Sequence, residues 1–172
     1  MRDYRNNPIT ESITINAPLA RCFALSTRIE IVRETLGMDL VDTGLTSGHI
    51  TANSRVVWRG WKFGLLTEHH TLITAFAEPH LNAANELTAW FQDSQERGRF
   101  AFFQHDHFLS QPVDSAITTL HDEIRFTLPF GPLGSLAATL LLAPHIRKLA
   151  RQRFALIKTL AEGDGWRAWA PE

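Results

Sequence analysis

The strongest constraint on the fold is a change in the spacing of apolar residues near residue 130. From 133 to 161 apolar residues recur every three or four positions, which predicts a helix with one apolar face. Pro144 lies inside it, and we expect it to kink or break the helix there. Before residue 130, runs rich in β-branched and aromatic residues alternate with Gly and Pro breaks, which predicts strands over 55–63, 66–79, 87–95, 99–112 and 115–130.

The N-terminal part adds one strand and two short helices. Alternation in ITESITINAP predicts a strand over 9–18, and the spacing in 17–37 predicts a helix in two short pieces that ends at Gly37. This order of elements predicts an α+β fold in which a curved antiparallel sheet holds one long C-terminal helix. One helix cannot close the interior of such a sheet everywhere, so a cavity between helix and sheet is expected. We predict a single domain over 1–172, with its core at about 9–162 and a flexible tail at 163–172.

Composition narrows the class of protein. Apolar residues make up 44% and charged residues 20% of the 172 residues, and the net charge of −1 gives no general attraction to nucleic acid. The single cysteine, Cys22, excludes an intramolecular disulfide and a cysteine-rich zinc site. The N-terminus lacks the apolar core of a signal peptide, and the longest apolar run, 136–143, is too short to span a bilayer. We therefore expect a cytoplasmic protein without a transmembrane segment.

The stretch FQHDHFL, residues 103–109, supplies the candidate site. On a strand, His105 and His107 share one face with Phe103 and Leu109. A tight turn near 113–114 would place His105 directly opposite Asp122 on the next strand. The other residues of that phase of the second strand are apolar: Leu120, Ile124, Phe126 and Leu128. The histidine face is therefore predicted to be the face that points to the interior.

The residues alone leave several roles open for this pair. His105 and Asp122 could simply satisfy each other in the core, orient a ligand in a cavity, or act in acid/base catalysis. A metal would need further ligands, and of His69 and His70, which point to opposite faces of a strand, only one could join. We predict no catalytic residue, no metal site and no cofactor.

Two further patterns bear on the interior and the surface. Trp58 and Trp61 have opposite strand parity, so both cannot face the cavity unless Gly60 marks a bulge. A row of basic residues falls largely outside the apolar stripe of the last helix and is predicted to be a solvated face, with an anionic membrane surface as the alternative partner: Arg147, Lys148, Arg151 and Arg153.

Several motifs in this order resemble the START-like, or SRPBCC, superfamily of helix-grip proteins. SITINAPLARCFAL resembles the opening strand and helix of that superfamily, and FQDSQERGRFAFFQHDHFL with TTLHDEIRFTLPFGPLG resembles its later hairpin and the entry to its last helix. The similarity covers roughly residues 9 to 162. Its nearest branch is bacterial and ligand-binding, with members often labelled cell division inhibitor or polyketide cyclase/dehydrase-like. The superfamily shares no set of catalytic residues.

The resemblance implies a hydrophobic cavity for a lipid, polyketide, sterol or quinone-like molecule. We expect such a small molecule as the partner, no nucleic acid, and at most a transient contact with a membrane surface. The alternatives are a polyketide cyclase- or aromatase-like enzyme that uses His105 as acid/base in the same cavity, or an interaction protein with a collapsed core. The predicted ligand-binding residues are His105, His107 and Asp122 at the polar end of the ligand, with Phe91, Phe103, Ile124, Phe126 and Leu128 as the apolar wall.

Overall fold

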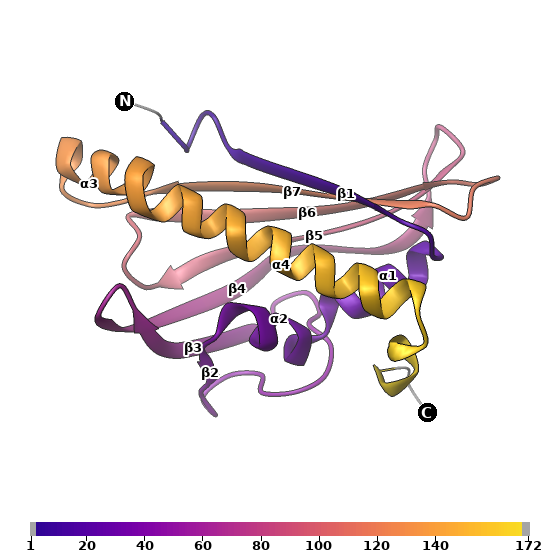
Figure 1. Ribbon diagram of the computed structural model, residues 1–172, viewed down its shortest axis with the longest axis horizontal. Helices are drawn as coiled ribbons and strands as arrows, with labels where there is room; N and C mark the ends of the chain where they lie inside the picture. Colours follow the sequence, from indigo (N-terminus) through magenta and orange to yellow (C-terminus); the bar gives the residue numbers. More distant parts are fainter. Residues whose placement is uncertain (1–2, 170–172) are drawn as a thin grey trace.

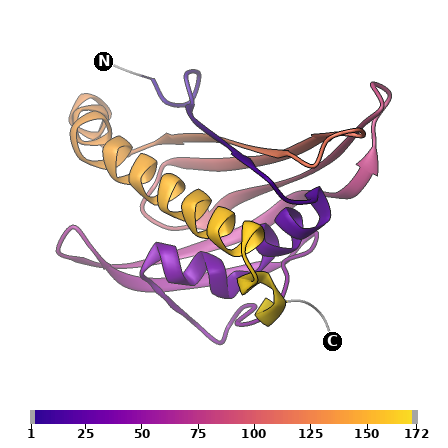
Figure 2. The same ribbon diagram turned by 45° about the vertical axis from the view of Figure 1, so that its right-hand side comes forward.

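A computed structural model of the protein describes residues 3–169 and is built around one antiparallel sheet. Its seven strands follow the order β1-β7-β6-β5-β4-β3-β2, so β2 to β7 form a meander and β1 pairs with β7 at the opposite edge (Figure 1). The sheet curves around the long C-terminal helix (Figure 2). The strands are β1 (Ile9–Ile15), β2 (Asp39–Leu40), β3 (Arg55–Lys62), β4 (Leu65–Leu81), β5 (Glu86–Arg97), β6 (Phe102–Pro112) and β7 (Thr118–Thr127).

The helices lie where the spacing of apolar residues predicts them. Two short helices, α1 (Leu19–Thr27) and α2 (Ile29–Leu36), follow β1, and α2 ends at Gly37, whose φ of 60° suits glycine. The C-terminal run consists of α3 (Gly131–Ala137), a π-helical turn (Ala138–Leu142) and α4 (Ala143–Glu162). None of the helices in the described part of the chain is long and apolar enough to cross a membrane. The predicted α+β architecture is confirmed.

Pro144 does not break the C-terminal helix, which corrects one of the two effects expected of it, a kink or a break. The helical run continues through it, because the turn just before it is π-helical and the N–H of Ala143 donates to the carbonyl of Ala138, five residues back. In a π-turn each N–H donates to the carbonyl five residues back instead of four. After this change Pro144 lies in the first turn of α4, where a missing N–H donor is tolerated.

The core has two parts along α4. The first lies under α1 and the C-terminal half of α4 and contains Phe23, Phe91 and Ile157. The second lies towards α3, where the ring of Tyr4 stacks on Phe126 at 4.9 Å between centroids. The apolar stripe predicted on the last helix is the face that both parts bury.

The register of the β6–β7 hairpin differs from the expected one by two residues. His107, rather than His105, lies directly opposite Asp122, and His105 lies opposite Ile124. The connection is a looser loop over 113–117, held by the side-chain amide of Gln111, which donates to the carbonyl of Ser115. A shift of two residues keeps every side chain on its predicted face, so the histidines still point inward.

Residues 165–169, which the sequence placed in a flexible tail, form a 3-10 turn against α1. The guanidinium of Arg21 lies 4.2 Å from the ring centre of Trp166, and both Trp166 and Trp169 pack on the first core part. The remaining residues of that predicted tail, 170–172, lie outside the described residues.

Candidate functional site

A cavity of about 440 Å³ lies between the inner face of the sheet, α2 and the C-terminal helical run. Its walls are mostly apolar, with Val32 and Leu36 from α2, Trp58 from β3 and Ile146 from α4. The opposite parity of the two tryptophans of β3 has the predicted effect, because Trp58 is buried in this wall and Trp61 is exposed. The volume falls within the range of small-molecule sites.

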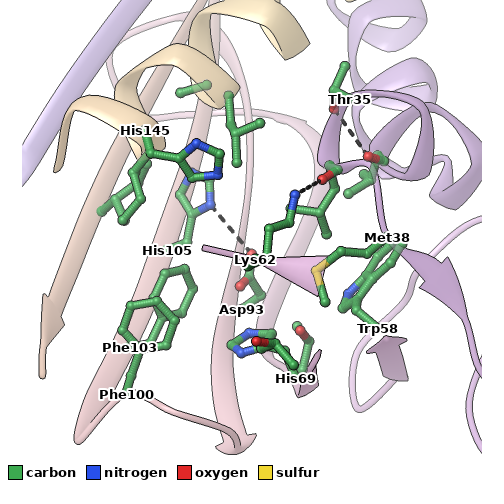
Figure 3. Close-up of a pocket in the computed structure, with 18 of the residues that line it drawn as sticks. Thr35, Met38, Trp58, Lys62, His69, Asp93, Phe100, Phe103, His105 and His145 are labelled. Carbon is green, nitrogen blue, oxygen red and sulfur yellow. Dashed lines mark hydrogen bonds and ion pairs between the residues drawn. The ribbon is translucent and has the colours of Figure 1, made fainter. Parts of the chain in front are cut away.

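A cluster of charged side chains lies at the inner end of the cavity. Asp93 reaches it from β5, His105 and His107 from β6, and Arg153 from α4, and all four line the cavity. Figure 3 shows His105 and Asp93 directed toward each other across neighbouring strands. Asp122 of β7 is 2% exposed and lies behind the two histidines.

His107 is held between two carboxylates. Its Nδ1 lies 2.9 Å from Oδ1 of Asp122, and its Nε2 lies 3.0 Å from Oδ2 of Asp93. Burial alone would lower the pKa of His107, but the charge of Asp122 and the hydrogen bonds to both carboxylates outweigh it and raise the pKa. An imidazolium that donates from both ring nitrogens satisfies this geometry, because carboxylates only accept.

Arg153 completes the balance of charge. Its Nη1 lies 3.1 Å from Oδ2 of Asp122, and its Nη2 donates to the carbonyl of Ser26 at 3.2 Å. Burial would raise the pKa of Asp122, but the positive charges of His107 and Arg153, together with the contact to His105, hold it well below its usual range. The pKa of Asp93 is lowered in the same way, with the hydrogen bond from His107 acting against burial. Two carboxylates, one guanidinium and one imidazolium thus form a neutral buried group.

His105 is the member of the cluster with unused hydrogen-bonding capacity. Its Nε2 lies 3.0 Å from Oδ2 of Asp122. This contact is an ion-pair contact with poor hydrogen-bond geometry, and within residues 3–169 the nitrogen makes no other hydrogen bond. Burial, and then the charge of His107, lower the pKa of His105, so its ring is neutral at pH 7. A neutral imidazole in the cavity wall can accept or donate one hydrogen bond to a bound molecule.

Three of these side chains lie close enough together to be ligands of one metal ion. Ligand atoms of Asp93, His105 and His107 lie within 4.8 Å of one another, as two imidazoles and one carboxylate. A divalent cation would have to displace the proton that His107 shares with Asp93, and the guanidinium of Arg153 lies 3.1 Å from Nδ1 of His107. Both conditions oppose binding of a cation, so the expectation of no metal site stays a prediction.

Six of the eight predicted ligand-binding residues line the cavity: Phe91, Phe103, His105, His107, Ile124 and Leu128. Asp122 is shielded behind the histidines, and Phe126 is buried in the second core part instead. The structure therefore brings the predicted polar trio together, although through a different register.

Sequence reasoning missed two members of the cluster. Arg153 was predicted on a solvated face, which is wrong, because it is only 7% exposed. Its spacing from Ile146, Ala150 and Ile157 placed it on the buried stripe, which was the available signal. Asp93 shares a strand face with Phe91 and could have been found in the same way.

Comparison with known proteins identifies the fold. No family model and no curated protein matches the sequence. Among solved structures, a START superfamily protein from Mycobacterium smegmatis is 12% identical over 89% of this chain and 98% of its own, with a TM-score of 0.58. A protein from Thermus thermophilus is 14% identical over 87% of this chain and 96% of its own, with a TM-score of 0.58.

Norcoclaurine synthase from Thalictrum flavum, solved with dopamine and hydroxybenzaldehyde, is 7% identical over 87% of this chain and 85% of its own, with a TM-score of 0.55. At such identities the similarity is one of fold alone. The alignments extend over 87–89% of this chain, so the likeness covers nearly the whole fold. The chain therefore has the same helix-grip fold as these START-like structures, which is the fold that its motifs predict.

Proposed function

We propose that the protein binds an amphipathic small molecule, of lipid, polyketide or quinone-like type, with its apolar body in the cavity and its polar end against the inner cluster. The observation that carries this proposal is a hollow, mostly apolar interior of about 440 Å³ whose wall includes the neutral ring of His105. An apolar interior with a few polar side chains in its wall is typical of small-molecule sites.

The charges of the cluster indicate the chemistry of the polar end. Asp93 is ionised and can accept hydrogen bonds, and the neutral rings of His105 and His69 can do the same. At the inner end a ligand carboxylate would face Asp93, and the cation of the described cluster, Arg153, is already paired with Asp122. Lys62 and Arg99 line the cavity outside this cluster. A hydroxyl or phenol, which donates, suits these acceptors better. The norcoclaurine synthase structure shows that this fold can enclose small aromatic molecules.

The binding proposal is tested with a neutral fluorescent probe, N-phenyl-1-naphthylamine, and a matched pair of variants. Ala150 lines the cavity and is buried, whereas Ala155 lies on the same helix and is exposed. Wild type and Ala155→Trp should bind the probe saturably, and Ala150→Trp should bind it about tenfold more weakly, because the indole fills the cavity. Equal binding by all three proteins would place the probe elsewhere and contradict the proposal.

The natural ligand is sought by native mass spectrometry of the purified protein, followed by denaturing extraction. A stoichiometric adduct that is absent from Ala150→Trp and present in Ala155→Trp would name the chemical class of the ligand. An adduct that both variants retain would not come from the cavity.

An enzyme is the second candidate, and His105 favours it. A neutral imidazole in an apolar cavity, 3.8 Å from Asp93, can accept a proton from a bound enol or phenol, as a polyketide cyclase- or aromatase-like reaction requires. Turnover of a poly-β-keto substrate should then be lost in His105→Gln while probe binding is retained. Product formation that survives this substitution would exclude His105 as the base.

The cytoplasm is the compartment that we propose. The single cysteine, Cys22, can form no disulfide within the chain, which suits a reducing compartment. Cell fractionation with an antibody to the chain tests this assignment, and recovery from an extracytoplasmic fraction would contradict it.

A further inference from the structure

We propose that the end of the molecule at which the cavity opens docks on an anionic phospholipid bilayer. The inference deepens the proposed function and rests on it in one respect, because the bilayer would be the place where the cavity exchanges its ligand. The evidence is the distribution of exposed apolar side chains, the backbone of two phenylalanines and the distribution of charge.

Two segments at this end expose large apolar side chains, and together we call these side chains the rim. The β3–β4 hairpin contributes Trp61, Phe63, Leu65 and Leu66, each 52–70% exposed. The start of the C-terminal helical run contributes Phe130, Leu133, Leu136, Leu140 and Leu141, each 51–84% exposed. Nine of the thirteen exposed large apolar side chains in the described residues thus lie in the rim, far more than single scattered residues would give.

The two halves of the rim meet at the cavity mouth. The ring of Phe63 contacts that of His145 on α4 edge to face, with centroids 5.1 Å apart, and Phe63, Leu65 and Leu141 all line the cavity. Arg99, from the β5–β6 turn, donates to the carbonyl of Leu66 at 2.9 Å. In Figure 1 the β3–β4 turn and α3 lie at the same end of the molecule, on the left. In Figure 3, His145 and Lys62 both lie among the side chains that line the cavity.

Two phenylalanines of the rim are held in an unfavourable backbone conformation. Phe63 has φ of 52° and Phe130 has φ of 74°, in the left-handed region that bulky side chains avoid. The rings that this conformation displays are 58% and 84% exposed. Neither the core nor the cavity gains from Phe130, so its display is explained by a partner that covers it.

The charges at this end are mostly of one sign. The β3–β4 turn, the β5–β6 turn and the start of the C-terminal helical run, residues 61–67, 97–103 and 128–148, contain five basic residues and no aspartate or glutamate: Lys62, Arg97, Arg99, Arg147 and Lys148. The N-terminal turn packed beside them adds one charge of each sign, Asp3 and Arg5. Arg147 lies 3.8 Å from Glu11 of β1, which is shared with Arg151. The acidic residues that flank the first two segments, Glu68 and Glu96, are paired with arginines of β3. Apolar side chains bordered by basic ones are the composition of a surface that binds anionic lipid.

The same charges argue against a second copy of the chain as the partner. A symmetric dimer through the rim would place the basic residues of one copy against those of the other, and the three segments offer no acidic residue to separate them. A bilayer that contains anionic headgroups supplies the missing negative charge and a place for the apolar side chains. A membrane over the mouth would also let an apolar ligand enter the cavity without crossing water.

The docking is tested by sedimentation with vesicles of phosphatidylcholine alone and of phosphatidylcholine mixed with phosphatidylglycerol. The rim variant is Phe130→Ser/Leu133→Ser. The matched control is Leu81→Ser/Ile117→Ser, which removes two apolar side chains that are 54% and 48% exposed, at the end of β4 and in the β6–β7 loop. Wild type and control should bind the mixed vesicles, binding should weaken with salt, and the rim variant should bind about tenfold more weakly. Arg97→Gln/Arg99→Gln should weaken binding to the mixed vesicles and leave any binding to phosphatidylcholine vesicles unchanged.

Three results would overturn the docking: no sedimentation of the wild type, equal loss in rim variant and control, or a dimer in sedimentation velocity that the rim variant dissociates. The two proposals fail separately. If the wild type binds N-phenyl-1-naphthylamine but neither kind of vesicle, the cavity function stands and the docking proposal is wrong. If the wild type binds vesicles in a way that the rim variant loses, but does not bind the probe, the docking stands and the cavity function is wrong.

Discussion

Replacement of Asp122 by asparagine gives the sharpest test of the buried cluster. The carboxylate lies 2.9 Å from Nδ1 of His107 and 3.1 Å from Nη1 of Arg153. Asparagine keeps its shape and removes its charge, so Arg153, 7% exposed, would lose its buried counterion. Removal of one partner of a buried ion pair costs about 3–5 kcal/mol, and we expect Asp122→Asn to lower the free energy of unfolding by that amount.

Urea unfolding followed by tryptophan fluorescence measures this loss, with the buried Trp58 as one reporter. With a denaturant dependence of about 2 kcal/mol per M, a loss of about 4 kcal/mol moves the unfolding midpoint down by about 2 M. The control is Glu96→Gln, which removes the exposed partner of Arg55 and should leave the midpoint nearly unchanged.

A double-mutant cycle assigns the loss to the ion pair. Arg153→Met alone leaves Asp122 without one cation, and Asp122→Asn alone leaves Arg153 without its anion. The double variant leaves neither charge uncompensated, so its loss should be smaller than the sum of the single losses by about 2 kcal/mol. Additive losses, or a midpoint for Asp122→Asn equal to that of the control, would refute the reasoning.

The remaining predictions concern the same cavity. The pKa of His107 is raised in the folded protein, so its protonation stabilises the fold below the unfolded pKa of about 6.5, and this stability is lost as pH rises through the folded pKa. In urea unfolding, the difference in free energy of unfolding between wild type and His107→Gln should therefore shrink from about pH 6 to pH 9. Phe91→Ala removes a buried ring stacked on His107 and should cost about 3–5 kcal/mol by the same assay. Zn²⁺ should not raise the melting temperature at neutral pH, because Arg153 and the shared proton oppose it; a rise that Asp93→Asn abolishes would contradict this. Amides of 131–142 should exchange with deuterium faster than those of 146–161, and equal protection would contradict a loosely held mouth.

Strand faces could be predicted from the sequence, whereas cross-strand partners could not. The apolar alternation in 99–112 and 115–130 determined which side of each strand points inward, and a register shift of two residues does not change that side. The shift did change the direct partner of Asp122 from His105 to His107, because partner identity depends on the length and geometry of the loop at 113–117. Both histidines still contact Asp122, since one reaches it diagonally.

Arg153 shows a different limit. Composition rules place arginine at the surface, and only a buried counterion makes another position stable. The counterion, Asp122, is on β7, 31 residues before Arg153 along the chain. Whether it lies beside Arg153 therefore depends on how α4 packs on the sheet. Pro144 is similar, because the π-helical turn that accommodates it is set by the packing of the whole helical run and has no local sequence signal that we recognise.

The helical run 131–162 has an inner half that is packed on the sheet and an outer half that is largely exposed. In the inner half, Ile146, Ala150 and Ile157 are buried and Arg153 ties α4 to the sheet and to Ser26. In the outer half, α3 buries only Gly134 and presents leucines to solvent. Local opening takes place where few apolar contacts must break, so the outer half can move while the inner cluster keeps its geometry. A ligand that enters past the rim would therefore meet a polar cluster that is already assembled, and its binding would not be weakened by the entropy of ordering that cluster.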